Sequence, residues 1–124
     1  MKMLYVSQRK FLLVDVESKL QEYYEVLGCD LVEYARRSIG GRNFLIICDE
    51  EGRLKNNAIT AFNKRFEPDI VGALLVCGID EEGNERDLTD EELTILVRNS
   101  LRIEVELDGS NYTRYALRNV EYPH

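Results

Sequence analysis

The chain has 124 residues, of which 44% are hydrophobic and 31% are charged, and its formal net charge is −7. These values are typical of one globular domain with its own core, and the acidic balance argues against direct nucleic-acid binding, which depends on clustered lysine and arginine. No apolar run approaches the length of a membrane span and the N-terminal residues lack a signal-peptide pattern, so we expect a cytoplasmic protein without membrane contacts.

The N-terminal part of the chain predicts two short strands followed by a helix. Residues 3–6 and 11–16 are apolar runs separated by a polar turn. A helix is predicted over residues 18–27, where Ser18 and Gln21 have the spacing of a capping box. The apolar side chains at helical spacing in this segment are Leu20, Tyr23, Tyr24 and Leu27.

The middle of the chain predicts a hairpin and a central strand. Residues 31–37 and 43–48 form the hairpin, because the two glycines between them permit positive φ angles. Residues 71–79 are almost wholly apolar and bounded by glycines, which indicates a central strand buried on both faces. Between these elements, residues 58–66 predict one or two turns of helix.

A helix and a second hairpin are predicted near the C-terminus. Thr89 and Glu92 match the N-cap and third residue of a capping box, which predicts a helix over 90–99. Residues 103–107 alternate between apolar and charged side chains, and residues 112–121 return as the second strand. Because a two-stranded ribbon is marginal alone, we expect it to pack on its own sheet or on a second subunit of a homo-oligomer.

These elements together predict a single α+β domain over residues 1–124. We expect a mainly antiparallel sheet of five or more strands, with both helices on one face and a C-terminal β-hairpin. The expected core residues are Leu20, Leu27, Ile46, Leu74, Val76, Leu93 and Leu96.

The sequence lacks the residues that several classes of enzyme need for catalysis. His124 is the only histidine and the last residue, which argues against Ser-His-Asp, Cys-His and histidine-containing zinc sites. The three cysteines are widely spaced, and the common glycine-rich phosphate loops are absent. We therefore expect no enzymatic activity, no catalytic residues, no cofactor and no metal.

Basic residues are concentrated in the middle of the sequence, and no acid occurs between Gly52 and Phe66. Arginine and asparagine donors pair with phosphates and base edges, and aromatic rings stack on bases. The candidate ligand-binding residues are Arg36, Arg42, Arg53, Lys55, Asn56, Asn57, Phe62 and Arg65. The other interpretation is a solvated basic face that offsets the acidic segment.

That acidic segment, residues 80–92, holds eight acids against Arg86 alone and accounts for the whole net charge. A localised acidic surface suits a basic partner. The candidate partner-binding residues are Glu81, Glu82 and Asp87.

Five short motifs follow one another along the chain: Met1 to Val6, Leu20-Gln21, Gly28 with Val32-Glu33, Asp49 to Leu54, and Val71 to Val76. This series resembles a family of small phage- and plasmid-borne proteins of Gram-positive bacteria that is known only as a domain of unknown function. The family-like core covers residues 1–100, and residues 101–121 are expected to be an appended hairpin. Ile59-Thr60-Ala61 stands where many relatives have Leu-Asn-Arg.

The resemblance implies a mobile-element setting, in which small non-enzymatic proteins often inhibit host defence. We expect an anti-defence accessory protein that acts in the host cytoplasm and sequesters an anionic small molecule, such as a cyclic nucleotide immune signal. The alternative is an acidic protein–protein inhibitor, a nucleic-acid mimic that binds a host defence protein.

Overall fold

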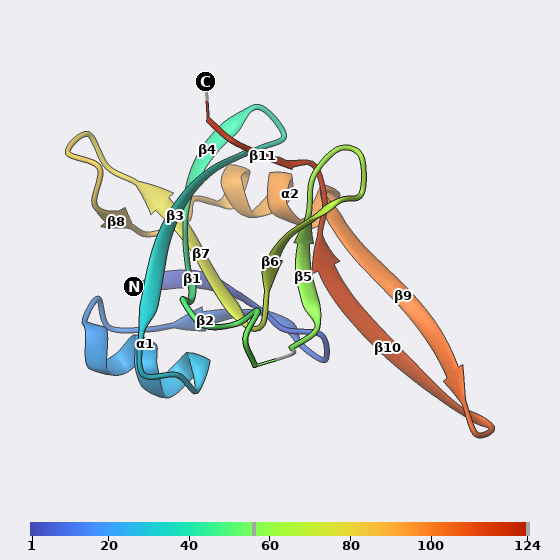
Figure 1. Ribbon diagram of the computed structural model, residues 1–124. Coiled ribbons are helices and arrows are strands. Elements are labelled where there is room, and N and C mark those ends of the chain that lie inside the picture. The colour runs from blue at the N-terminus through green and yellow to red at the C-terminus, as the bar shows by residue number, and fades with distance from the viewer. Residues whose placement is uncertain (56, 124) are drawn as a thin grey trace.

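A computed structural model describes residues 1–55 and 57–123 and confirms an α+β fold built around a mainly antiparallel sheet (Figure 1). The first sheet has seven strands in the order β11-β3-β4-β7-β1-β2, with β8 paired to β7, and all its pairings are antiparallel. Its strands are β1 Lys2–Val6, β2 Phe11–Asp15, β3 Val32–Ile39, β4 Arg42–Asp49, β7 Leu74–Ile79, β8 Glu85–Arg86 and β11 Val120–Glu121.

The second sheet has four strands in the order β6-β5-β10-β9. Its strands are β5 Ile59–Phe62, β6 Pro68–Val71, β9 Ser100–Leu107 and β10 Ser110–Leu117. β10 runs parallel to β5 and antiparallel to β9. The predicted C-terminal hairpin is therefore confirmed as β9 and β10, which project well beyond the rest of the molecule (Figure 1).

The central strand was predicted in the right place but too long. β7 lies between β4 and β1, and all its residues but the last are buried. Gly72 has a φ of 92° and separates β7 from β6, so residues 71–79 are two strand segments of different sheets. The helical turns predicted for residues 58–66 are wrong, because this segment forms β5 and pairs with β6.

The two helices, α1 Leu20–Leu27 and α2 Asp90–Arg98, begin differently. The capping box of α2 is confirmed: Thr89 Oγ1 accepts from the Glu92 N–H, and the Glu92 carboxylate accepts from the Thr89 N–H. The capping box predicted for α1 is wrong, because its N-cap residue, Lys19, makes no side-chain cap. The Ser18 hydroxyl instead donates to Glu85 at 2.9 Å.

The helices lie on opposite faces of the first sheet, which corrects the expectation that they share one face. Ile46 of β4 belongs to a core cluster with Leu96 of α2, whereas Ile47 belongs to a second cluster with Tyr23 and Leu27 of α1. Successive strand residues point to opposite faces, and both faces of β4 are apolar, so each face needs its own cover. The second sheet completes the cover on the side of α2, where Ile70 and Leu117 join the core.

The expected core is correct except at one position. Leu27, Ile46, Leu74, Val76 and Leu96 are buried, and Leu93 is half-buried against the same core. Leu20 is 50% exposed, because it is the first residue of α1 and Tyr23 and Leu27 fill the inward face of that helix. Among the described residues, neither helix has the length and apolar character that crossing a bilayer requires.

Candidate functional site

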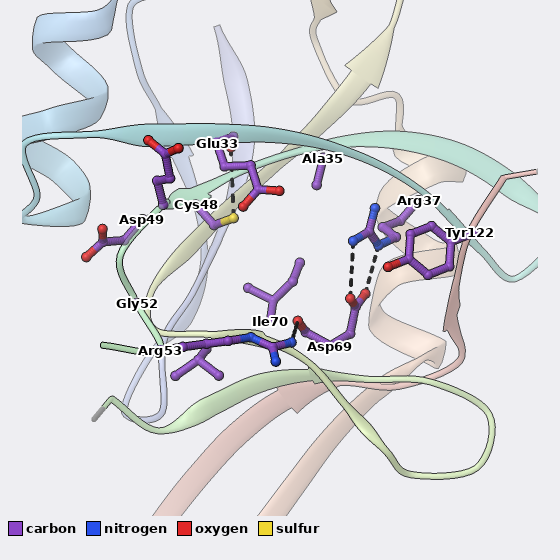
Figure 2. Close-up of a pocket in the computed structure, with 12 residues that line it drawn as sticks. Glu33, Ala35, Arg37, Cys48, Asp49, Gly52, Arg53, Asp69, Ile70 and Tyr122 are labelled. Atoms are coloured by element: carbon purple, nitrogen blue, oxygen red, sulfur yellow. Dashed lines mark hydrogen bonds and ion pairs between the residues drawn. The ribbon is translucent and has the colours of Figure 1, made fainter. Parts of the chain in front are cut away.

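A partly open hollow lies between the two sheets and is lined by β3, β4, the loop after β4, β6 and the segment after β11 (Figure 2). We call it the inter-sheet pocket; its volume is about 220 Å³. Its charged lining residues are Glu33, Asp49, Glu50 and Asp69 against Arg37 and Arg53. Acids outnumber bases, so this pocket does not suit an anion.

The two bases of the inter-sheet pocket are already engaged. Arg37 donates from Nε to Asp69 Oδ2 at 2.8 Å and from Nη2 to Asp69 Oδ1 at 3.2 Å (Figure 2). Its guanidinium also lies 4.3 Å from the ring centroid of Tyr122, and hydrogen bonding to Asp69 raises the pKa of Arg37. Arg53 donates to the backbone carbonyl of Asp69 at 2.9 Å. Arg37 thus fastens β6 to β3, and Arg53 fastens β6 to the segment after β4, which is a structural role.

A larger hollow, which we call the arginine pocket, opens where β4 and β7 diverge. The register of these strands ends at the Leu45–Cys77 pair, and the pocket lies beyond it, with a volume of about 630 Å³. It is lined by Arg36, Arg42, Asn43, Ile79, Arg86, Glu92 and Pro123. Three guanidinium groups from β3, β4 and β8 therefore line one space, against one carboxylate.

Arg86 is the fixed member of this set. Its Nη1 and Nη2 donate to the two carboxylate oxygens of Glu92, each at 2.9 Å, and Glu92 is only 1% exposed. Gly78 makes room for the pair, since a Cβ there would lie 2.5 Å from the Arg86 guanidinium carbon. Hydrogen bonding to Arg86 holds the pKa of Glu92 below its usual value, so this buried carboxyl stays ionised.

Arg36 and Arg42 have most of their donors available. Arg42 donates to Glu91 at 3.1 Å, and its side chain is 39% exposed. Arg36 is exposed. The side-chain hydrogen bond that Arg36 makes within the described residues is a long one, 3.5 Å to the carbonyl of Gly83. The arginine pocket is consequently the described hollow best suited to an anionic group.

The other predicted ligand residues lie outside this pocket. Arg53 lines the inter-sheet pocket, and Lys55 and Asn57 line a third hollow, where Lys55 is 2.8 Å from Asp49. Arg65 lines another hollow, at the β5–β6 turn, and Phe62 is half-buried in β5. Asn56 lies outside the described residues. The stretch without acids in the sequence is therefore not free of acids in space, and no single small molecule contacts the whole predicted set.

Asn43 and Arg86 line the arginine pocket but were not among the predicted ligand residues. Arg86 had one available signal: it is a lone base among eight acids, and such a base usually has a carboxylate partner. Asn43 had none, because its place in the pocket depends on where β4 separates from β7.

The acidic candidates divide into two kinds. Glu81 and Glu82 are exposed in the β7–β8 turn, which projects from the body (Figure 1). The Asp80 carboxylate fixes this turn by accepting from the backbone N–H groups of Glu82 and Asn84 at 2.9 and 2.8 Å. Asp87 instead accepts from the Lys2 N–H at 2.6 Å and joins β1 to the chain before α2.

The described side chains provide little for covalent or metal chemistry. All three cysteines are free and buried, and burial raises the pKa of Cys48 and of Cys77 to about 12. Such thiols stay protonated at neutral pH and are poor nucleophiles. Residues 1–55 and 57–123 contain no group of three or more His, Cys, Asp or Glu placed to hold a metal ion.

Comparison with known proteins gives a family but no characterised relative. No curated protein and no solved structure matches the chain significantly. A family model described as a domain of unknown function, DUF3846, matches residues 1–101, which end at the beginning of β9. The match covers most of the chain, and the protein belongs to the DUF3846 family.

Proposed function

We propose that this protein is a non-enzymatic accessory protein that captures an anionic small molecule in the arginine pocket. The observation that carries the proposal is the convergence of Arg36, Arg42 and Arg86, which come from three strands, on one hollow. Guanidinium groups bind phosphates through paired, charge-assisted hydrogen bonds. The pocket volume of about 630 Å³ lies within the range of small-molecule sites.

A nucleotide is the anion that fits the remaining lining. Ile79 and Pro123 offer apolar contacts for a base or sugar, and the Asn43 side chain offers an amide for a base edge or hydroxyl. Arg36 and Arg42 supply donors for phosphate oxygens, while Arg86 is held in place by Glu92. The proposed ligand is a linear or cyclic nucleotide, bound through its phosphates.

The same lining supports the proposal of capture without chemical change. Among the described residues that line the pocket, Glu92 is the only carboxylate, and it is ionised and engaged in two hydrogen bonds with Arg86. A general acid needs a proton to give, and a general base needs a free lone pair directed at the substrate. The proposed biological role is sequestration of an immune nucleotide in the cytoplasm of a host cell, in line with the mobile-element setting that the family resemblance implies.

Isothermal titration calorimetry against cyclic and linear nucleotides, with inorganic phosphate and pyrophosphate as fragments, tests this proposal. We expect at least one nucleotide to bind with one-to-one stoichiometry per chain, and chromatography to recover it unaltered. No binding across the panel would overturn the proposal. Recovery of a hydrolysed or transferred product would overturn its non-enzymatic part.

The β7–β8 turn favours a second candidate function, inhibition of a defence protein by an acidic surface. Glu81 and Glu82 are exposed on a turn that the Asp80 carboxylate fixes, so their charges are displayed in a defined place. On this alternative, the protein competes with duplex DNA for a defence protein, and reversal of both glutamates to lysine abolishes the competition. Asp108, exposed at the tip of the β9–β10 turn, is the control for charge reversal.

A further inference from the structure

One face of the β9–β10 ribbon carries an exposed row of apolar β9 side chains, and Arg114 and Ser110 of β10 lie beside this row. We call its projecting part, residues 101–116, the arm (Figure 1). Alternate residues of β9 place Leu101, Ile103, Val105 and Leu107 on one face, and Tyr112 of β10 pairs with Val105 on that face. Ile103, Leu107 and Tyr112 are 48%, 54% and 42% exposed. A continuous row of this kind indicates an interaction surface.

The arm has little support from its own chain. β10 pairs with β5 only at Leu117, and the backbone of Tyr115 donates to Gln8 at 2.9 Å near the base of the arm. Beyond that point, no described strand pairs with either strand of the ribbon. Two strands alone are marginally stable in water, so the arm lacks a third strand or a packing surface.

The outer edge of the arm is a regular template for pairing. β9 is the last strand of its sheet and pairs with β10 without a bulge from Ser100 to Leu107. Asp108 and Gly109 have φ angles of 50° and 79°, as in a two-residue type I′ turn. The pair that flanks such a turn, Leu107 and Ser110, is hydrogen-bonded, and hydrogen-bonded pairs then alternate with non-hydrogen-bonded pairs along the ribbon. The backbone N–H and C=O groups of Arg102, Glu104 and Glu106 therefore point away from β10, toward the open edge. An open edge of this kind accepts another strand.

We propose that β9 pairs antiparallel with β9 of a second copy, around a twofold axis at Ile103. In this register Arg102 lies opposite Glu104 of the second copy, and Glu104 lies opposite its Arg102. Ile103 lies opposite Ile103 of the second copy, and Leu101 lies opposite Val105 of the second copy. The two ribbons become one four-stranded sheet in a closed symmetric dimer, with the apolar rows of the two β9 strands side by side at its centre.

Charge selects this register over its neighbours. A twofold axis at Arg102 places that arginine opposite itself, and an axis at Glu104 places that glutamate opposite itself. An axis at Val105 places Glu104 opposite Glu106. Like charges directly opposite each other are destabilising, and opposite charges are stabilising. The axis at Ile103 gives two oppositely charged pairs and no like pair, which favours a second copy as the occupant of this edge.

An exchange of charges tests the pairing by sedimentation velocity over a concentration series. The wild-type protein should sediment as a dimer, whereas Arg102→Glu alone and Glu104→Arg alone should each be monomers. A mixture of these two variants should form a dimer again, because every arginine then faces a glutamate of the other chain. Glu25→Arg, at an exposed position of α1, is the control and should stay dimeric.

A wild-type monomer at every concentration, or single variants that remain dimers, would overturn the proposal. Cysteine cross-linking supplies a second measurement that does not depend on charge. Residues opposite each other in a non-hydrogen-bonded pair have Cα atoms about 4.5 Å apart, which suits a disulfide. Ile103→Cys should give a disulfide-linked dimer on mild oxidation, and Leu107→Cys, which is exposed on the same face, should not. Equal cross-linking of both variants would contradict the twofold axis at Ile103.

Discussion

Gly40 and Gly41 form the β3–β4 turn with φ angles of 60° and 83°, yet their surroundings differ. A Cβ on Gly40 would lie 2.8 Å from Ile95 Cγ2 and 2.9 Å from Asn99 Nδ2 of the neighbouring helix end. A Cβ on Gly41 would meet nothing within 4 Å. Both glycines supply the positive φ angles that the turn needs, and the backbone also approaches α2 closely at Gly40.

Alanine substitutions at the two positions separate the effect of the positive φ angle from the effect of the close approach to α2. Gly41→Ala should lower the free energy of unfolding by about 1 kcal/mol, the cost of a left-handed backbone for a residue with a Cβ. Gly40→Ala should cost about 2 kcal/mol more, because Ile95 is packed against the core and Asn99 Nδ2 donates to the Ile95 carbonyl. Urea denaturation measures both free energies of unfolding. Equal losses would show that α2 can shift away from the new Cβ with no loss of stability.

Glu92 should make stability depend on pH through its pair with Arg86. Its pKa in the folded protein lies below the ordinary value of 4.5, so it binds protons more weakly in the folded state than in the unfolded one. Its contribution is therefore complete above pH 4.5 and is lost as the pH falls through the folded-state pKa.

Glu92→Gln should lower the free energy of unfolding by about 2 kcal/mol at pH 7, where it removes charge-assisted hydrogen bonds to Arg86. The difference between wild type and variant should shrink in acid, as the wild-type carboxyl becomes protonated. Glu91→Gln is the control, because Glu91 is exposed and its pair with Arg42 is weak. A difference that is the same at pH 7 and in acid would rule out the proposed linkage.

At the scale of elements, the pair of Arg37 and Asp69 holds β3 of one sheet to β6 of the other. Their side chains are only 12% and 14% exposed, so removing either partner leaves the other charge poorly solvated. Arg37→Ala and Asp69→Ala should each cost about 3 kcal/mol, and the double variant should cost clearly less than their sum.

The exposed pair of Arg42 and Glu91 is the matched control for this double-mutant cycle. Its coupling energy should be below about 1 kcal/mol. Urea denaturation of the four variants in each cycle measures both couplings. Similar couplings for the two pairs would mean that burial does not strengthen the link between the sheets.

Elements with local signals could be predicted from the sequence, and elements defined by distant partners could not. The α2 capping box lies within four residues, so Thr89 and Glu92 predicted it correctly. The strand β5 depends on pairing with β6 and on Thr60, whose buried hydroxyl donates to the carbonyl of Gly72 at 2.6 Å. Nothing within residues 58–66 alone distinguishes that strand from a turn of helix.

At the scale of the whole molecule, the fold brings only two of the predicted ligand residues into the arginine pocket. Arg36 and Arg42 were both expected as ligand residues, and they do line one pocket. Arg53 and Lys55 were grouped with them because they are close in sequence, but their partners are the Asp69 carbonyl and the Asp49 carboxylate. Ion pairs between distant strands decide which bases are available, and they follow from the fold rather than from local composition.

The most direct test of the arginine pocket compares Arg36→Ala with Arg65→Ala in calorimetric titrations with the tightest-binding nucleotide. Both wild-type side chains carry one positive charge, but Arg36 lines the arginine pocket and Arg65 lies at the β5–β6 turn. A charge-assisted hydrogen bond contributes about 1.5–3 kcal/mol, so Arg36→Ala should weaken binding about tenfold or more. Arg65→Ala should leave the affinity unchanged. Equal weakening by both variants, or none by Arg36→Ala, would contradict the assignment of the ligand to this pocket.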